Sequence, residues 1–232
     1  MRVLFVQQDH VSPVGPIGEG FARRGYDLEL LPVVPSDRFH APDVSVVFPD
    51  PLGYDAIVPM GAPWSVYDHG TIGSWVRDEL AFLRAAHDAG VPVLGICFGG
   101  QALAAALGGG VERSPSPEIG WVSIDVLGGQ LDPGPWFQFH YDRWTLPPGA
   151  RELARTALAS QAFVLGRSLA VQFHPELTVA QLEAWLGNGG QDYLQRSGRD
   201  PAALLAETRR RGDESAGRAR RLVDRFLDRV AR

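Results

Sequence analysis

The single cysteine of this 232-residue chain, Cys97, has Gly95 and Gly99 two residues away on either side. The apolar run Val91–Ile96 precedes it and an Ala- and Leu-rich run follows, which predicts a buried strand that turns sharply into a helix. Glycines suit both positions because such a tight turn leaves no room for side chains. Free amides and the helix dipole at the turn favour a thiolate. We interpret Cys97 as a nucleophile; the alternative is a buried cysteine beside a turn.

A second segment carries the partners that a cysteine nucleophile needs. His174 and Glu176 lie two residues apart at the end of a predicted strand. In an extended chain such residues project to the same side, and Pro175 stiffens the segment between them. A base beside the thiol, held by a third group, is the arrangement that activates a cysteine. The alternative interpretation is an exposed His-Pro-Glu turn that caps a helix over Thr178–Leu186.

Three segments, in order, resemble motifs of the class I (triad) glutamine amidotransferases, and the nearest similarity is to the glutaminase part of GMP synthase and its stand-alone relatives. The resemblance covers about residues 2–186. The segments are Met60–Asp68, similar to the Gly-Gly-Pro-x-Ser-Val oxyanion loop, Gly-Ile-Cys-Phe-Gly-Gly-Gln at 95–101, and Val-Gln-Phe-His-Pro-Glu at 171–176. Glu118–Trp121 and Phe139–Asp142 also fall in the expected order.

This resemblance implies a cysteine-dependent amide hydrolase that releases ammonia from glutamine, with no metal or cofactor. Cys97 would attack the side-chain amide while His174, oriented by Glu176, shuttles the proton. The remaining implied site residues are the oxyanion-hole group Gly61, Ala62 and Phe98, and the substrate-binding group Gln101, Phe139, His140 and Tyr141. His140 is expected to be chiefly structural, because Glu176 already orients His174.

The elements that must position these residues alternate along the first half of the chain. Apolar runs predict strands over Arg2–Val6, Leu28–Val34, Val44–Phe48, Ala56–Met60 and Val91–Ile96, with a helix over Ser74–Ala89. Repeated strand-helix-strand order predicts a parallel sheet. From residue 118 the runs at 122–126, 136–144, 162–165 and 169–173 predict shorter, partly antiparallel strands. We expect an α/β fold with a mostly parallel central sheet, helices on both faces and a small antiparallel portion, which the resemblance identifies as flavodoxin-like.

We predict that residues 1–190 form the amidotransferase domain and that residues 191–232 form a helical, Arg-rich extension packed on it. Asp200 is a suitable N-cap and Pro201 a suitable first helical residue. An apolar stripe at 219, 222, 223, 226, 227 and 230 makes the last helix amphipathic. The alternative is that this stripe docks a partner.

Composition excludes several classes of function. The 22 basic residues are all arginine, which excludes a Walker A loop and a pyridoxal-phosphate Schiff base, because both need lysine. Interspersed acids and the lack of an aromatic stacking platform argue against nucleic-acid binding by the tail. The chain has no apolar run long enough for a membrane span, and the apolar run at its N-terminus is too short for the hydrophobic region of a signal peptide. We expect a cytoplasmic protein.

Three functions remain open. The first is a glutaminase subunit that passes ammonia to a separate synthetase or other amination partner, since little chain follows the motifs. The second is a γ-glutamyl hydrolase that acts on γ-glutamyl amines or related amides. The third is a catalytically silent regulatory homologue, which intact Cys97, His174 and Glu176 argue against. We predict no oligomeric state from the sequence.

Overall fold

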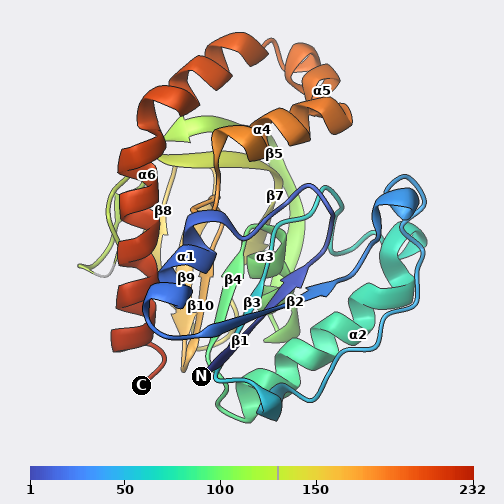
Figure 1. Cartoon of the computed structure of the whole chain (residues 1–232), viewed down its shortest axis with the longest axis vertical. Helices are drawn as coiled ribbons and strands as arrows, with labels where there is room; N and C mark the ends of the chain where they lie inside the picture. The colour runs from blue at the N-terminus through green and yellow to red at the C-terminus, as the bar shows by residue number, and fades with distance from the viewer. Residues whose placement is uncertain (130) are drawn as a thin grey trace.

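The computed structural model describes residues 1–129 and 131–232, and its strands and helices alternate over the first half of the chain (Figure 1). The strands are β1 (Arg2–Gln7), β2 (Asp27–Pro32), β3 (Ala56–Pro59), β4 (Val93–Ile96), β5 (Gly110–Val122), β6 (Asp125–Val126), β7 (Trp136–Thr145), β8 (Arg151–Arg155), β9 (Ser160–Leu165) and β10 (Ser168–Val171). The α-helices are α1 (Gly15–Arg23), α2 (His69–Asp88), α3 (Phe98–Ala106), α4 (Val179–Trp185), α5 (Gln191–Arg196) and α6 (Pro201–Arg229).

The central sheet has the strand order β2-β1-β3-β4-β10-β9-β8-β6. Neighbours from β2 to β10 are parallel, whereas β9, β8 and β6 are added antiparallel. Every residue of β3 and β4 is buried. Helices cover both faces of the sheet, so these strands have continuous apolar sequences instead of alternating ones. The predicted fold class, a mostly parallel sheet with a small antiparallel portion, is confirmed.

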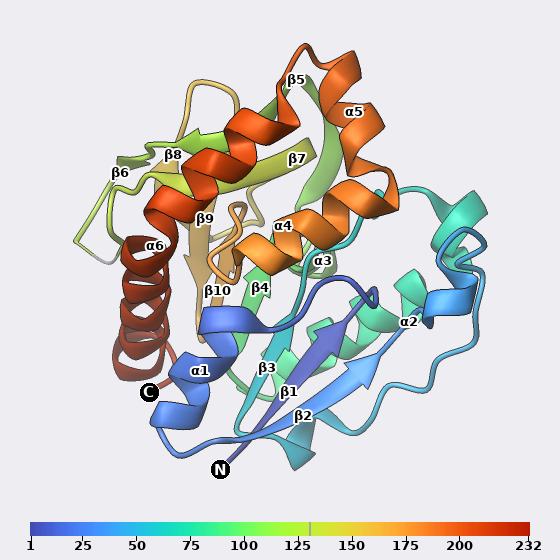
Figure 2. The same cartoon turned by 45° about the horizontal axis from the view of Figure 1, so that its top comes forward.

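The two faces of the sheet are covered by different helices (Figure 2). Phe5 of β1 meets Phe21 of α1 edge to face, with 5.8 Å between ring centroids. The next residue, Val6, belongs to the opposite apolar cluster with Trp75 of α2. Full burial of one such side chain contributes about 1.5–3 kcal/mol. Alternate residues of β1 therefore attach α1 and α6 to one face and α2 and α3 to the other.

The antiparallel pair β5–β7 forms a second sheet at the upper end of the molecule in Figure 1. Its register is interrupted between Arg113 and Glu118, and Pro115 and Pro117 fall in this gap. Proline cannot donate a ladder hydrogen bond, so an irregularity accommodates both rings. These prolines lie among charged residues and interrupt any apolar periodicity. The sequence therefore predicts no strand over residues 110–117, where β5 begins.

The predicted strand over Val44–Phe48 is wrong. The segment pairs with no strand among the described residues and runs along α2 instead. Phe48 stacks on Phe82 of α2 at 5.4 Å between ring centroids, and Val44 and Val46 pack against the same cluster. An extended chain that buries alternate residues against a helix has the same period of two as a strand that buries them against a sheet.

The arginine-rich C-terminal segment forms one long helix, α6, which packs beside α1 (Figure 2). The Asp200 side chain accepts a hydrogen bond from the Ala202 amide at 2.9 Å, as an N-cap does. Phe226 and Val223 are fully buried on the face that α6 shares with α1. The helix therefore completes the core on that face, while the division of the chain at residue 190 stays a prediction.

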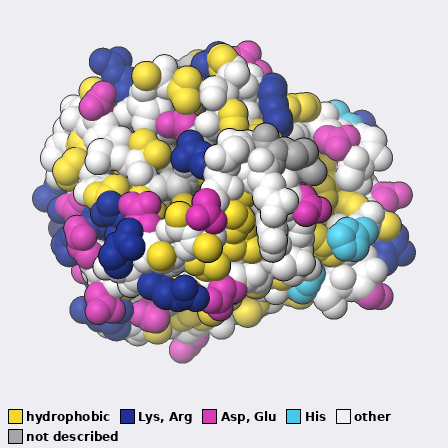
Figure 3. All heavy atoms as spheres, turned by 90° about the horizontal axis from the view of Figure 1, so that it is seen from above, with side chains coloured by type: hydrophobic (Ala, Val, Ile, Leu, Met, Phe, Trp, Pro, Cys, Tyr) yellow, Lys and Arg dark blue, Asp and Glu magenta, His cyan; other side chains and the backbone are white. Residues whose placement is uncertain are grey.

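Ion pairs to the rest of the chain hold the polar face of α6. Arg24 bonds Asp224 at 3.0 Å and Asp228 at 2.6 Å, and Arg221 and Arg225 each reach Asp132 at 2.8 Å. On the face seen in Figure 3, basic and acidic side chains lie next to each other and form no uniform basic patch.

No helix in the described part of the chain is long and apolar enough to span a bilayer.

One ionisable side chain, Glu79, lies fully buried in α2. Its Oε1 accepts a 2.6 Å hydrogen bond from Nε2 of Gln8, and the other carboxyl oxygen meets no donor among the described residues. Burial raises the pKa of Glu79 to about 8 from its ordinary value of 4.5, and the Gln8 hydrogen bond offsets only part of this rise. The carboxyl is therefore protonated in the folded protein at neutral pH.

This burial predicts a stability that falls as pH rises. Between about pH 5 and pH 8 the folded chain keeps a proton that the unfolded chain releases, so its free energy of unfolding drops by up to about 1.4 kcal/mol per pH unit. Glu79→Gln removes this titration and keeps the acceptor for Gln8. Urea unfolding at several pH values should show the wild type losing stability relative to the variant across this window. Parallel curves would contradict the assignment.

Candidate active site

The turn between β4 and α3 presents Cys97. The residue has φ 49° and ψ −108°, and it is the one non-glycine residue with positive φ in the described ranges. A Cβ at Gly95 would lie 2.7 Å from the Gly99 carbonyl oxygen, and one at Gly99 would overlap the Pro59 carbonyl. Side chains are therefore excluded at both positions, and the strained turn directs the Cys97 side chain outward at the start of α3.

The turn is attached to the strands on either side of β4. The Cys97 amide donates to the Val171 carbonyl at 2.8 Å, at the end of β10. The Gly99 amide donates to the Met60 carbonyl at 2.9 Å, directly after β3. Because β3, β4 and β10 are parallel neighbours, their carboxyl ends meet at one edge of the sheet. Residues that follow any of these strands therefore arrive beside the sulfur.

His174 and Glu176 arrive in this way from β10. The His174 amide donates to the Phe137 carbonyl at 2.8 Å, which attaches the segment to β7. His174 Nδ1 donates to Glu176 Oε1 at 2.7 Å, and both side chains are buried. A Cβ at Gly61 would lie 3.0 Å from His174 Cε1 and 3.7 Å from Cys97 Cβ, so the imidazole and the cysteine both flank Gly61. The hydrogen bond at Nδ1 leaves Nε2 as the ring nitrogen open to another partner.

The charges around His174 favour its protonated form. Burial by itself lowers the pKa of His174, but the neighbouring charges and hydrogen-bonding contacts of Cys97 and Glu176 more than offset this effect. The resulting pKa is well above its usual value. No described residue satisfies Nε2 with a well-directed hydrogen bond. The arrangement suits an imidazolium beside a thiolate, with a carboxylate behind the ring.

A pocket of about 350 Å³ opens over Cys97. This volume lies at the lower end of the range of about 300–1,000 Å³ typical of small-molecule sites. Glu176, which lies behind His174, is the one predicted site residue outside the pocket lining. The structure brings these predicted residues together in the lining: Gly61, Ala62, Cys97, Phe98, Gln101, Phe139, His140, Tyr141 and His174.

Backbone amides without a backbone acceptor line the pocket together with Cys97. The amides of Gly61, Ala62 and Phe98 donate to no backbone acceptor within residues 1–129 and 131–232. Phe98 is the first residue of α3, where a helix leaves its amides unsatisfied, and Gly61 and Ala62 follow β3. An anion that forms next to Cys97 therefore has donors on both sides.

Gln101 and His140 are both held by one backbone carbonyl, that of Asp142. Gln101 Nε2 donates to it at 3.1 Å and His140 Nδ1 donates to it at 2.9 Å. The other His140 nitrogen lies 3.3 Å from Glu118 Oε2. Both nitrogens of His140 thus face protein atoms, which leaves neither for proton transfer at Cys97. The side-chain oxygen of Gln101 is the atom left to meet a ligand in the pocket.

Asp142 is a site residue that the sequence analysis left without a role, although it quoted Phe139–Asp142 among the matching segments. Its buried carboxylate lines the pocket, accepts hydrogen bonds from the hydroxyls of Ser65 and Tyr67, and lies 3.8 Å from Arg113. Asp9 also lines the pocket, and burial raises its pKa. The available signal for Asp142 was its place as the last residue of that matching segment in β7.

Within the described ranges, no three His, Cys, Asp or Glu side chains are placed to hold a metal ion. His174 shares the pocket wall with Cys97, and its Nδ1 is engaged by Glu176. A cysteine, an imidazole and backbone donors thus adjoin one another at this site.

A family model described as glutamine amidotransferase class-I matches residues 19–189. The chain is similar to the glutamine-hydrolysing GMP synthase of Mycobacterium leprae, with 39% identity over 167 residues that cover 68% of this chain and 28% of that protein. The protein of the same name from Aeropyrum pernix is 42% identical over 134 residues, which cover 51% of this chain and 26% of that protein. The chain thus spans little more than a quarter of these curated relatives.

Two solved structures share the fold over nearly the whole chain. A glutamine amidotransferase from Thermotoga maritima superposes with a TM-score of 0.83 and 24% identity, covering 98% of each chain. A glutamine amidotransferase from Methylobacillus flagellatus gives a TM-score of 0.82 and 26% identity, covering 97% of this chain and 94% of that one.

The contact at Gly61 predicts that a single methyl group disturbs the site. In Gly61→Ala the new Cβ pushes against His174 Cε1 and displaces the imidazole from the sulfur, so the thiolate is less favoured. Alkylation of Cys97 by iodoacetamide at neutral pH, followed by mass spectrometry, should slow several-fold. The chain has one cysteine, so the signal has one source.

Gly212→Ala is the matched control for this substitution. A Cβ at Gly212 on α6 meets nothing within 4 Å, so the same change should leave alkylation at the wild-type rate. If circular dichroism shows that both proteins are folded, equal alkylation rates in wild type and Gly61→Ala would show that the imidazole does not control the reactivity of the sulfur.

Proposed function

The chain belongs to the class I glutamine amidotransferase family, and we propose that it hydrolyses glutamine to glutamate and ammonia through Cys97, His174 and Glu176. One observation carries the proposal. A buried imidazole, bonded at 2.7 Å to a carboxylate, lies beside a cysteine that a strained turn presents at a helix N-terminus. These are the nucleophile, base and orienting group that amide hydrolysis needs.

Acylation begins with the Cys97 thiolate. Its sulfur bonds to the side-chain amide carbon of glutamine, and the carbonyl oxygen becomes an oxyanion. His174 gives its Nε2 proton to the amide nitrogen, the carbon–nitrogen bond breaks, and ammonia leaves. The product on the enzyme is a γ-glutamyl thioester, and His174 is neutral.

Deacylation returns the protein to its starting state. Neutral His174 takes a proton from water, whose oxygen bonds to the thioester carbon. The carbon–sulfur bond then breaks, which releases glutamate and restores the thiolate beside the imidazolium. Glu176 keeps the imidazole in one orientation through both steps, because its carboxylate accepts from Nδ1.

We assign the oxyanion to the amide of Phe98 and to the Gly61-Ala62 loop. These donors belong to α3 and to the end of β3, so they face the sulfur from two elements. Preorganised donors of this kind are worth about 3–4 kcal/mol each in acyl transfer. The α-amino-acid end of glutamine would meet Gln101, Asp142 and the backbone of Phe139 and Tyr141, because a buried carboxylate and a free amide oxygen suit an ammonium group.

We further propose that the ammonia serves an amination on a separate synthetase. The relatives named glutamine-hydrolysing GMP synthase support this proposal, because their name couples glutamine hydrolysis to a synthase reaction. This chain aligns with only 26% to 28% of their length, and the rest of those proteins lies outside the similarity.

Loss of the nucleophile should abolish turnover. Cys97→Ala should lower kcat for glutamate release from glutamine by about 10³-fold or more, because no thioester can form. A coupled glutamate assay measures this loss, and Gly212→Ala should retain wild-type turnover.

Comparing glutamine with γ-glutamyl amines in kcat/KM tests the alternative substrate class. A clear preference for the amines would change the assigned activity from glutaminase to γ-glutamyl hydrolase.

The Glu176 carboxylate should set the pH dependence of the reaction. Its charge and hydrogen bond help to raise the pKa of His174, so Glu176→Gln lowers that pKa while an amide oxygen can still accept from Nδ1. The imidazolium is then lost at lower pH, and the alkaline limb of kcat/KM should move toward neutrality. We expect kcat to fall about 10²-fold. An unmoved alkaline limb would assign it to another group.

A further inference from the structure

Gln172 is a fully buried glutamine that the proposed reaction leaves without a role. It directly follows β10, and its backbone amide donates to the backbone carbonyl of Gln161 at 2.9 Å. The preceding residue, Val171, accepts from the Cys97 amide. Backbone hydrogen bonds on both sides therefore hold residue 172 next to the nucleophile.

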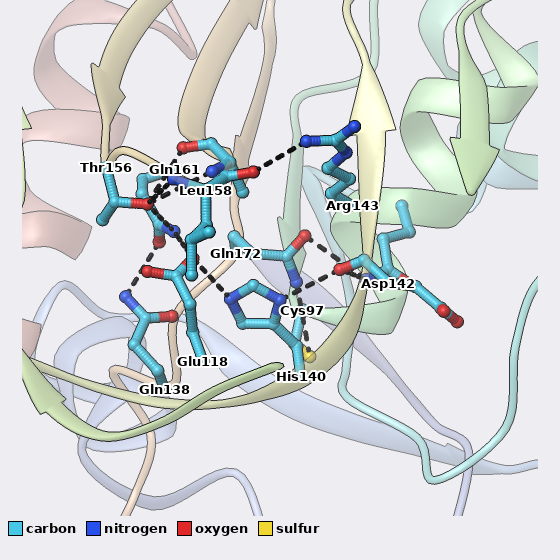
Figure 4. Close-up of polar contacts among 12 residues, drawn as sticks. Cys97, Glu118, Gln138, His140, Asp142, Arg143, Thr156, Leu158, Gln161 and Gln172 are labelled. Carbon is cyan, nitrogen blue, oxygen red and sulfur yellow. Dashed lines mark hydrogen bonds and ion pairs between the residues drawn. The ribbon is translucent and has the colours of Figure 1, made fainter. Parts of the chain in front are cut away.

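The carboxamide of Gln172 bridges the nucleophile and the pocket (Figure 4). Its Nε2 donates to Cys97 Sγ at 3.7 Å, and its Oε1 accepts from Gln101 Nε2 at 3.3 Å. All three side chains are buried. One amide thus contacts both the attacking sulfur and a side chain of the proposed substrate-binding group.

The surrounding hydrogen bonds decide which way this carboxamide faces. The Asp142 carbonyl can only accept, so the Gln101 atom that faces it must be the NH₂ group. That group then offers its second hydrogen to Gln172, which must present its oxygen. The Gln172 NH₂ group is left for the sulfur. The flipped arrangement would set two donors against each other and place an oxygen against the sulfur.

The anchor of this chain of amides is deeper in the protein. The Asp142 carbonyl also accepts from His140 Nδ1, whose other nitrogen lies 3.3 Å from Glu118 Oε2 (Figure 4). Glu118 Oε2 in turn accepts from Gln161 Nε2 at 2.8 Å. The hydrogen bonds from Gln101 to the Asp142 carbonyl and to Gln172 thus hold both glutamine side chains before any ligand binds.

We propose that Gln172 is a positioning residue that stabilises the Cys97 thiolate and ties it to Gln101. The inference rests on the glutaminase proposed above. A hydrogen bond to a charged acceptor is stronger than one between neutral groups, and burial strengthens it further. Gln172 supplies such a donor without a proton of its own to transfer. His174 then exchanges protons with a sulfur whose place is fixed from a second direction.

The test compares two identical exchanges at equally buried glutamines. Gln172→Met removes the donor to sulfur. Gln138→Met removes a fully buried amide that donates to Gln161 Oε1 at 2.8 Å and makes no hydrogen bond to Cys97 among the described residues. We expect the midpoint of the pH dependence of iodoacetamide alkylation to rise by about one pH unit in Gln172→Met only. For glutamine hydrolysis in the same variant, kcat should fall about tenfold and KM should rise.

Charged groups near the sulfur must be the same in all variants for this comparison. They are His174 with Glu176 behind it, Asp9, Arg113 and Asp142 in the pocket wall, and the His140–Glu118 pair beyond Gln101. None is changed by either substitution. A Gln172→Met midpoint equal to those of wild type and Gln138→Met overturns the proposal.

A second variant and a wild-type measurement cover a failure to fold. Gln172→Glu is nearly isosteric and replaces the donor by an oxygen, so it should raise the alkylation midpoint at least as far as Gln172→Met. In the wild type, the side-chain amide resonance of Gln172 should shift as the thiolate forms, and the absence of a shift overturns the proposal. Alkylation needs no glutaminase activity. A wild type that releases no glutamate, with the shifted midpoint in Gln172→Met, refutes the proposed function alone.

Discussion

The site depends on the parallel order of β3, β4 and β10. Because these strands are neighbours and run the same way, the Gly61-Ala62 loop, Cys97 and His174 leave the sheet at one edge. Two backbone hydrogen bonds, from Cys97 to Val171 and from Gly99 to Met60, attach the turn to both neighbours. The turn that carries Cys97 is therefore positioned by backbone hydrogen bonds to both neighbouring strands.

Burial has opposite consequences at different carboxylates of this protein. Glu176 lies against the imidazole of His174, so its charge has a partner and raises the pKa of that ring. Glu79 has only an amide donor from Gln8, and burial keeps it protonated. The difference follows from the low local dielectric, which strengthens attraction between paired charges and penalises an unpaired charge.

The long C-terminal helix shows how arginine-rich sequence becomes part of a fold. Its apolar stripe covers the sheet face beside α1, and its arginines meet acids such as Asp132 that lie far away in the sequence. The segment before it contributes Trp185 and Tyr193 to the pocket wall, so chain beyond the catalytic motifs still shapes the site. The charge of the tail is used within the chain, which is why it forms no basic surface on the face seen in Figure 3.

Local sequence patterns were enough to predict several features: the strand that ends at Cys97, the glycines around it, the His174–Glu176 spacing and the Asp200 cap. Each depends on neighbours within a few residues, as backbone sterics and capping do. The other features arise from contacts in the folded chain. The tertiary structure showed that Val44–Phe48 lies on a helix, that proline-interrupted β5 pairs with β7, and that Asp142 and Gln172 reach the pocket and the sulfur. Those outcomes depend on partners that are well separated in the sequence, and no local pattern encodes which partner a buried polar group or an extended segment will meet.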